Sequence, residues 1–126
     1  MFVKESDSYR PGQWFSGGSP GGVAKIEPSG SIRALESVSG RLLWEFPLKS
    51  PPWAGLMATA GGVVFGGSSE GLFYALGASS GKPLWHLPAG GAIFANPVSF
   101  LGNGRQHVTI AAGSGLFAFA LPDAAQ

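Results

Sequence analysis

The sequence predicts an all-β protein, a partial β-propeller made of four-stranded antiparallel blades. Three observations lead to this fold class. A segment of 18 residues occurs twice, short apolar runs alternate with Gly-rich turns, and no segment keeps the 3.6-residue apolar period of a helix. The composition agrees, because 44% of the 126 residues are hydrophobic and 21 are Gly. Such a chain can bury a core and still turn sharply between strands.

The repeat aligns residues 30–47 (GSIRALESVSGRLLWEFP) with residues 71–88 (GLFYALGASSGKPLWHLP) without a gap, at a shift of 41 residues. A third partial copy, GLFAFALP, begins at Gly115 and ends before any Trp. Identical pairs in the two full copies include Gly30 and Gly71, Ala34 and Ala75, Leu35 and Leu76, Gly40 and Gly81, Leu43 and Leu84, Trp44 and Trp85, and Pro47 and Pro88. A four-stranded unit that recurs about every 40 to 45 residues has the period of propeller blades.

Four strands are expected in the best-preserved repeat. They cover residues 56–60, residues 63–65, residues 72–76 and a segment that carries Leu84 and Trp85. Gly61 and Gly62 suit a tight hairpin between the first two strands, because Gly readily takes a positive φ. In the third copy, strands are expected at residues 97–101, 107–112 and 116–120.

The domain organisation follows from this pattern. Residues 1–20 form an irregular lead-in and residues 21–126 form the partial propeller, with blade pieces at about 21–47, 56–88 and 96–121. About two full blades plus fragments cannot close a ring, which needs at least four. Blade faces and sheet edges would remain unpaired. The sequence therefore predicts an arc that is completed by remaining propeller blades or by self-association.

Charge and composition exclude several classes of function. Eight basic and seven acidic residues leave a net charge of +1, so no electrostatic footprint for nucleic acid is expected. The absence of Cys removes disulfides, thiolate metal sites and Cys nucleophiles. The first residues lack the apolar core of a signal peptide, and no apolar stretch reaches the roughly 18 residues of a membrane span. Neither a signal peptide nor a transmembrane segment is expected.

Few residues suggest catalysis by themselves. His86 and His107 lack carboxylate neighbours at ligand spacing, and the acidic residues form no pair for acid/base chemistry. The GGSSEG segment at residues 66–71 lacks the Lys and the helix of a phosphate-binding loop, so it is expected to be a turn.

The two repeats resemble the tryptophan-docking motif of pyrroloquinoline quinone (PQQ) dehydrogenases, Ala-x-Asp-x-x-Thr-Gly-x-x-x-Trp. Residues 51–67 and the stretch from ANPVSF to AAGSG resemble the last blades of the methanol and ethanol dehydrogenase branch, and the resemblance covers residues 13–122. The motif's Asp is replaced by Glu36 and Gly77, and its Thr by Ser39 and Ser80. The docking residues that the resemblance implies are Ala34, Gly40 and Trp44 in one copy and Ala75, Gly81 and Trp85 in the other.

The resemblance implies an eight-bladed ring that holds PQQ and calcium on its axis and oxidises alcohols by hydride transfer to the quinone. The catalytic Asp and the calcium ligands of the family have no matching position here, so no catalytic or metal-binding residue is expected. Trp53 and Ala54 match the family's Pro-Trp-(Gly/Ala)-Gly loop at the cofactor rim, and Phe94 is the repeat partner of Trp53. Members of the family are periplasmic.

The sequence leaves alternatives open. The leading hypothesis is a C-terminal arc of a PQQ-dependent alcohol dehydrogenase, inactive alone and unable to hold PQQ or calcium stably. The alternatives are a non-catalytic PQQ-like scaffold, as in outer-membrane assembly propellers, and a decayed or truncated reading frame. The stretch at residues 51–67 favours the dehydrogenase, and Gly77 favours the scaffold. Trp44 and Trp85 are expected to pack between blades rather than to bind a ligand. For Trp53, simple loop packing competes with the cofactor role.

Overall fold

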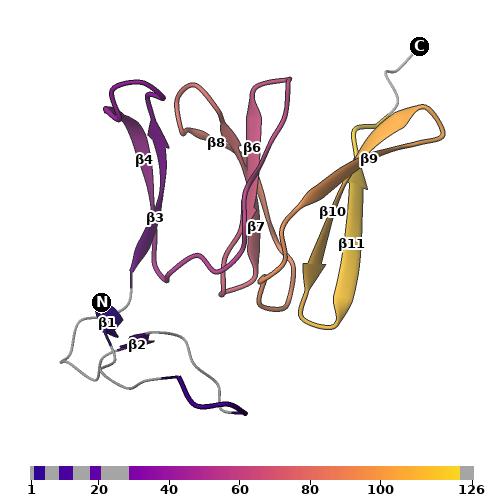
Figure 1. The fold of residues 1–126 in the computed structure, drawn as a ribbon. Coiled ribbons are helices and arrows are strands. Elements are labelled where there is room, and N and C mark those ends of the chain that lie inside the picture. Colours follow the sequence, from indigo (N-terminus) through magenta and orange to yellow (C-terminus); the bar gives the residue numbers. More distant parts are fainter. Residues whose placement is uncertain (1, 5–8, 13–17, 21–28, 123–126) are drawn as a thin grey trace.

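The computed structural model describes residues 2–4, 9–12, 18–20 and 29–122 (Figure 1). Every regular element in these residues is a β-strand, and every strand pairing is antiparallel. The expectation of an all-β fold is confirmed. Among the described residues there is no helix long and apolar enough to span a membrane.

Three sheets follow one another along the chain after a separate pair of short strands. That pair is β1 (Phe2–Lys4) and β2 (Gly18–Pro20). The first sheet is β3 (Gly30–Leu35) and β4 (Leu42–Leu48); the second is β5 (Met57–Ala58), β6 (Val63–Gly67), β7 (Leu72–Gly77) and β8 (Pro83–Pro88); the third is β9 (Val98–Gly102), β10 (Arg105–Ala112) and β11 (Gly115–Ala120). Each strand pairs with the next one in its sheet, which is the order of propeller blades.

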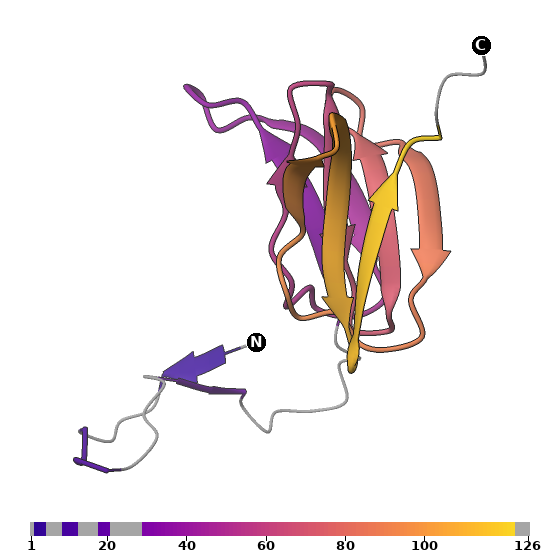
Figure 2. The same ribbon diagram turned by 90° about the vertical axis from the view of Figure 1, so that its right-hand side faces the viewer.

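The three sheets stand face to face, with the second between the other two (Figures 1 and 2). Only the second sheet has all four strands of a blade within the described residues. The first sheet contributes the two outer strands of a blade, and the third contributes the three inner ones. The described strands thus form an arc of consecutive blades rather than a closed ring.

The strand registers show that the sheets are equivalent. One row of cross-strand partners crosses each sheet at the same place in the repeat. The rows are Ala34–Trp44 in the first sheet, Met57–Phe65–Ala75–Trp85 in the second and Val98–Thr109–Ala118 in the third. The Ala and the Trp of each full repeat are therefore direct neighbours across two strands.

Counted between matched strand partners, the β10–β11 hairpin has one residue fewer than the β6–β7 hairpin. Gly67 pairs with Phe73, whereas Ala111, at the matching place in β10, pairs with Leu116. A slip of one residue moves every side chain to the opposite face of the sheet. Leu116 therefore takes the place of Phe73, and Phe117 faces back toward the second sheet.

The core consists of two layers, one on each side of β7. Phe73 and Tyr74 point to opposite faces of this strand and are both fully buried. The layer between the first and second sheets contains Ile32, Tyr74 and Leu76, with Trp44, Phe46, Leu48 and Leu72 packed around them. The layer between the second and third sheets contains Phe73, Ala89, Ile93, Ile110 and Ala112, with Ala54, Phe65, Val108, Phe117 and Phe119 around them. β7 is thus covered on both faces, as in a propeller blade between two neighbours.

Tyr74 fills its layer because Gly66 leaves room for its ring. A Cβ on Gly66 would lie 2.7 Å from the Tyr74 hydroxyl oxygen. That hydroxyl donates a hydrogen bond to the carbonyl oxygen of Gly67 at 3.4 Å. Burial raises the pKa of Tyr74 to about 12, so the phenol stays neutral at physiological pH.

The connection from β8 to β9 ties the second sheet to the third. The Ala89 N–H donates to the Gly71 carbonyl oxygen at 2.7 Å, and the Gly113 N–H donates to the Ala92 carbonyl oxygen at 2.9 Å. The backbones approach so closely that a Cβ on Gly91 would lie 2.8 Å from the Cα of Gly113. This connection fixes the end of the arc where the predicted cofactor rim lies.

Candidate functional site

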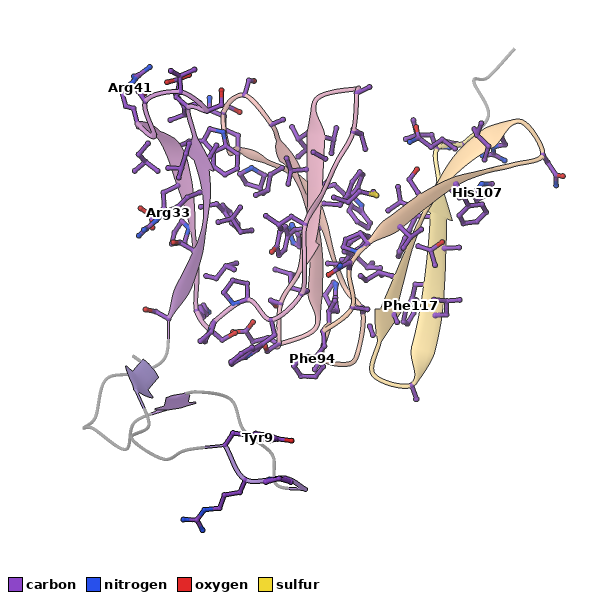
Figure 3. The ribbon with its side chains drawn as sticks, in the orientation of Figure 1. Tyr9, Arg33, Arg41, Phe94, His107 and Phe117 are labelled. Atoms are coloured by element: carbon purple, nitrogen blue, oxygen red, sulfur yellow. The ribbon has the colours of Figure 1, made fainter. Side chains whose placement is uncertain are left out.

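The predicted rim residue Trp53 lies in the β4–β5 connection, and its repeat partner Phe94 lies in the β8–β9 connection at the lower end of the sheets in Figure 3. Both side chains are largely exposed, Trp53 at 61% and Phe94 at 62%. The Gly55 N–H donates to Oδ1 of Asn96 at 2.7 Å, which joins the two connections. Gly55 and Asn96 also occupy the same place in successive repeats, 41 residues apart. Equivalent loops of neighbouring blades are therefore linked at one end of the arc.

The loop that carries Trp53 is held from both sides. Ala54 packs against the buried layer around Phe73, and the Ser69 hydroxyl donates to the Pro51 carbonyl oxygen at 3.5 Å. A Cβ on Gly30 would lie 2.7 Å from the Ser50 carbonyl oxygen, so the loop passes close over the start of β3. Pro51 and Pro52 restrict φ in the same segment. The indole of Trp53 is thus an exposed flat wall on an anchored loop.

In the described part of the chain, no three His, Cys, Asp or Glu residues gather where they could hold a metal ion. The acidic residue near the Trp53 loop is Glu70, in the β6–β7 turn. Hydrogen bonding from Ser68 is the largest cause that holds the pKa of Glu70 below its usual value, so this carboxylate is ionised at neutral pH. A single solvated carboxylate does not provide an acid/base pair.

The first sheet is joined to the second by the side chain of Trp44. Its indole N–H donates to the Ala78 carbonyl oxygen at 2.8 Å, and the hydrogen-bonded turn below the ring has Gly81 at φ 66°. A Cβ on Gly81 would lie 2.5 Å from Cε3 of Trp44, so the ring rests directly on this glycine. Only a residue without a side chain permits this contact.

Trp85, the second Trp of the repeat, lies between the second and third sheets in a different environment. Its ring makes edge contacts with Phe73 at 5.8 Å and Phe119 at 5.4 Å between ring centroids. It is 40% exposed, and its indole N–H has no acceptor within the residues that the structure describes. The two equivalent Trp residues thus share a register position but have different contacts: Trp44 lies on Gly81, whereas Trp85 lies against two Phe rings.

The turn after β3 keeps its carboxylate, whereas the matching turn after β7 has lost it. Glu36 accepts hydrogen bonds from the Ser39 N–H at 2.6 Å and the Val38 N–H at 3.1 Å. In the second turn Gly77 stands at this place, and the Ser80 N–H donates to the Gly77 carbonyl oxygen instead. Gly40 and Gly81 have matching positive φ angles of 69° and 66°. The backbone fold of the turn is therefore retained without the side-chain bonds.

We predict that Glu36→Gln makes the free energy of unfolding less dependent on pH in the acidic range. Hydrogen bonds from Ser39, and then from Val38, lower the pKa of Glu36 below its ordinary value of 4.5. A carboxyl with a depressed folded-state pKa stabilises the fold above its unfolded-state pKa, and this stabilisation is lost as the pH falls through the folded-state pKa. The free energies of unfolding of the wild type and Glu36→Gln, measured with urea, should differ more at pH 7 than at pH 3. An equal difference at the two pH values would contradict the prediction.

Comparison with known proteins identifies the repeat. The sequence profile of PQQ-type repeats described as "Outer membrane protein assembly factor BamB" matches residues 28–124. The chain belongs to this family of PQQ-repeat propellers. It is 42% identical over 86 residues to the quinoprotein ethanol dehydrogenase of Pseudomonas aeruginosa. The matched segment covers 68% of this chain and 14% of that protein.

Two further PQQ-repeat relatives support the same branch. The lanthanide-dependent methanol dehydrogenase of Methylorubrum extorquens is 32% identical over 117 residues, covering 86% of this chain and 18% of that protein. The crystal structure of the quinohemoprotein alcohol dehydrogenase of Comamonas testosteroni superposes with a TM-score of 0.66 at 35% identity, covering 73% of this chain and 14% of that one. The resemblance to PQQ-dependent alcohol dehydrogenases is confirmed, and the chain spans less than a fifth of these relatives.

Some residues of these PQQ-repeat contacts were not predicted from the sequence. Asn96, which accepts from the Gly55 N–H, could have been found from the repeat, since it stands 41 residues beyond that glycine. Ala78 could not, because it accepts the Trp44 hydrogen bond through its carbonyl oxygen. A backbone acceptor leaves no signal in the identity of the side chain.

Proposed function

We propose that this chain is a C-terminal arc of a PQQ-dependent alcohol dehydrogenase propeller and that Trp53 and Ala54 form one wall of the cofactor site. The observation that carries the proposal is the exposed indole of Trp53 on a loop whose next residue, Ala54, is anchored in the core. The 42% identity to a quinoprotein ethanol dehydrogenase supports the same assignment. By this resemblance the site of action is the periplasm.

The residues of this arc fit part of the cofactor site. A flat, exposed aromatic face on a fixed loop suits one side of a planar quinone. The described residues do not fit the metal, since no cluster of three potential ligands forms among them. Calcium ligands and the catalytic base are therefore assigned to other blades of the intact ring, and the role proposed for this arc does not involve the metal.

The proposed role of this chain is to bind PQQ and to enclose one side of it. When bound, PQQ supplies an electrophilic quinone that accepts hydride from the alcohol. Trp53 would cover one side of the ring system and exclude water there, with Ala54 leaving room for close approach. The Gly55 N–H is already bonded to Asn96, so its part is to hold the loop in place rather than to contact the cofactor.

We predict that the purified chain, given PQQ and Ca²⁺, reduces no dye with short alcohols, because the family's catalytic Asp and calcium ligands have no matching position in its sequence. PQQ binding, followed by fluorescence quenching, should be weak and should be reduced by Trp53→Ala. Phe94→Ala is the matched control, because Phe94 is equally exposed at the same place in the next repeat. Alcohol turnover by these 126 residues, or binding that is insensitive to Trp53→Ala, would refute the assignment.

A non-catalytic scaffold is the second candidate function. The matching family profile is described by an outer membrane assembly factor, and Gly77 lacks the carboxylate of the docking motif. In this case the arc would serve only as a binding surface within a propeller. Failure of both the wild type and Trp53→Ala to bind PQQ would favour this function over the dehydrogenase.

A further inference from the structure

The side-chain amide of Asn96 is bonded on one side and open on the other. Its Oδ1 accepts the Gly55 N–H at 2.7 Å. A backbone N–H can only donate, so the amide atom that faces it must be the oxygen, and this fixes the orientation of the group. Nδ2, with its two N–H donors, has no partner among the residues that the structure describes. Asn96 is exposed, so these donors are accessible to a ligand.

The backbone on both sides of Asn96 is anchored. The next residue, Pro97, is buried, and its ring restricts the backbone of Asn96 to extended conformations. Three residues before Asn96, Ile93 is fully buried, and its N–H donates to the Ser68 carbonyl oxygen at 3.1 Å. A polar group on such a segment keeps its direction, so little entropy is lost when a ligand binds to it.

The open side of the amide belongs to the same end of the arc as the exposed indole of Trp53. Gly55 follows Trp53 by two residues, and Asn96 follows Phe94 by two residues, at the end of the sheets where Figure 3 labels Phe94. The Gly55 N–H and the Ser69 hydroxyl are already used in bonds that hold the Trp53 loop, whereas the Nδ2 donors of Asn96 are not. Ligand sites combine an apolar face with a few placed polar groups of this kind.

We infer that Asn96 is a binding residue of this rim and that its Nδ2 donates to an oxygen at the edge of a planar ligand covered by Trp53. The ligand class is a fused aromatic ring system with carbonyl-type oxygens at its edge. The inference rests on the proposed function, because PQQ is a ligand of this class. One side chain thus has two separable roles: Oδ1 holds the Trp53 loop through Gly55, and Nδ2 binds the ligand.

The substitution Asn96→Asp separates these two roles. A carboxylate still accepts the Gly55 N–H, but at pH 7 it has no proton to donate. Hydrogen exchange of the Gly55 amide should therefore be as slow as in the wild type, while PQQ should bind about tenfold more weakly in equilibrium dialysis. Asn96→Ala should lose both properties. Asn103→Asp is the matched control, because it makes the same change of charge at an exposed position beyond the other end of β9, and it should leave PQQ binding unchanged.

The uncharged trimethyl ester of PQQ tests whether charge repulsion alone explains the loss. It keeps acceptor oxygens, so Asn96→Asp should also bind it about tenfold more weakly than the wild type does. Equal affinity of the two proteins for the ester would overturn the inference. In NMR spectra of the wild type, PQQ should shift the side-chain amide signals of Asn96. Unshifted signals, with binding that still depends on Trp53, would overturn the inference and leave the proposed function standing. Absence of PQQ binding to the wild type would refute both.

Discussion

Replacing Phe73 with Ala should lower the free energy of unfolding by about 3–5 kcal/mol, the usual cost of removing a buried aromatic ring. Phe73 is fully buried and is the centre of the layer between the second and third sheets. Its ring centroid lies 5.9 Å from that of Phe65, 5.8 Å from that of Trp85 and 5.5 Å from that of Phe119. Ala would leave a cavity where these three rings meet, and urea denaturation measures the loss.

Phe94→Ala provides the control for this substitution. Phe94 is 62% exposed in the β8–β9 connection, so the same change should alter stability by no more than about 0.5 kcal/mol. A loss below about 1 kcal/mol for Phe73→Ala would show that the second and third sheets do not depend on this layer. The arc would then be held together mainly by its connections.

The repeat made much of the fold predictable. Because the two copies align without a gap, the positions of Ala34 and Trp44 in one hairpin imply those of Ala75 and Trp85 in the other, and the registers agree. Most strands were also expected near their observed positions, since apolar runs and Gly-rich turns mark them locally. Local signals and periodicity are sufficient here because each blade is built from consecutive strands.

The third copy has a feature that the repeat did not predict. Gly71 and Gly115 each begin a GLF triplet, but Phe73 and Phe117 face opposite sides of their sheets. The cause is a hairpin that is shorter by one residue between matched partners, and turn length is harder to read from composition than strand type. For a similar reason, of the two glycines expected to form the β5–β6 hairpin, Gly62 takes a positive φ and Gly61 does not.

The candidate site was less predictable than the fold. Trp53 could be singled out by resemblance, but its loop is held by the packing of the partly buried Ala54 and by contacts from Ser69 and Asn96 in other connections. Such contacts join residues distant in sequence, often through backbone atoms. The repeat spacing of 41 residues could indicate the Asn96 contact, but the Ser69 contact is made to a backbone carbonyl oxygen and leaves no signal in the sequence.

Gly81→Ala should cost more stability than Gly40→Ala, and the difference measures the docking of Trp44. The two glycines occupy the same place in successive turns, with φ angles of 66° and 69°. An L-residue in this conformation costs about 1–2 kcal/mol at either site. A Cβ on Gly40 meets nothing within 4 Å, whereas one on Gly81 would strike the Trp44 ring. We expect a further loss of about 1–3 kcal/mol for Gly81→Ala, measured by urea unfolding.

A double-mutant cycle separates the clash from the backbone cost. Trp44→Ala removes both the ring that Gly81 supports and the hydrogen bond to Ala78. In that background, Gly81→Ala should cost no more than Gly40→Ala does in the wild type, since the added methyl group then has nothing to displace. If Gly81→Ala remained the more costly change without the indole, the contact between Trp44 and Gly81 would not be what joins the first two blades. If the two costs became equal, the extra cost of Gly81→Ala would be due to the Trp44 ring, which contributes to the contact between these blades together with the layer around Tyr74.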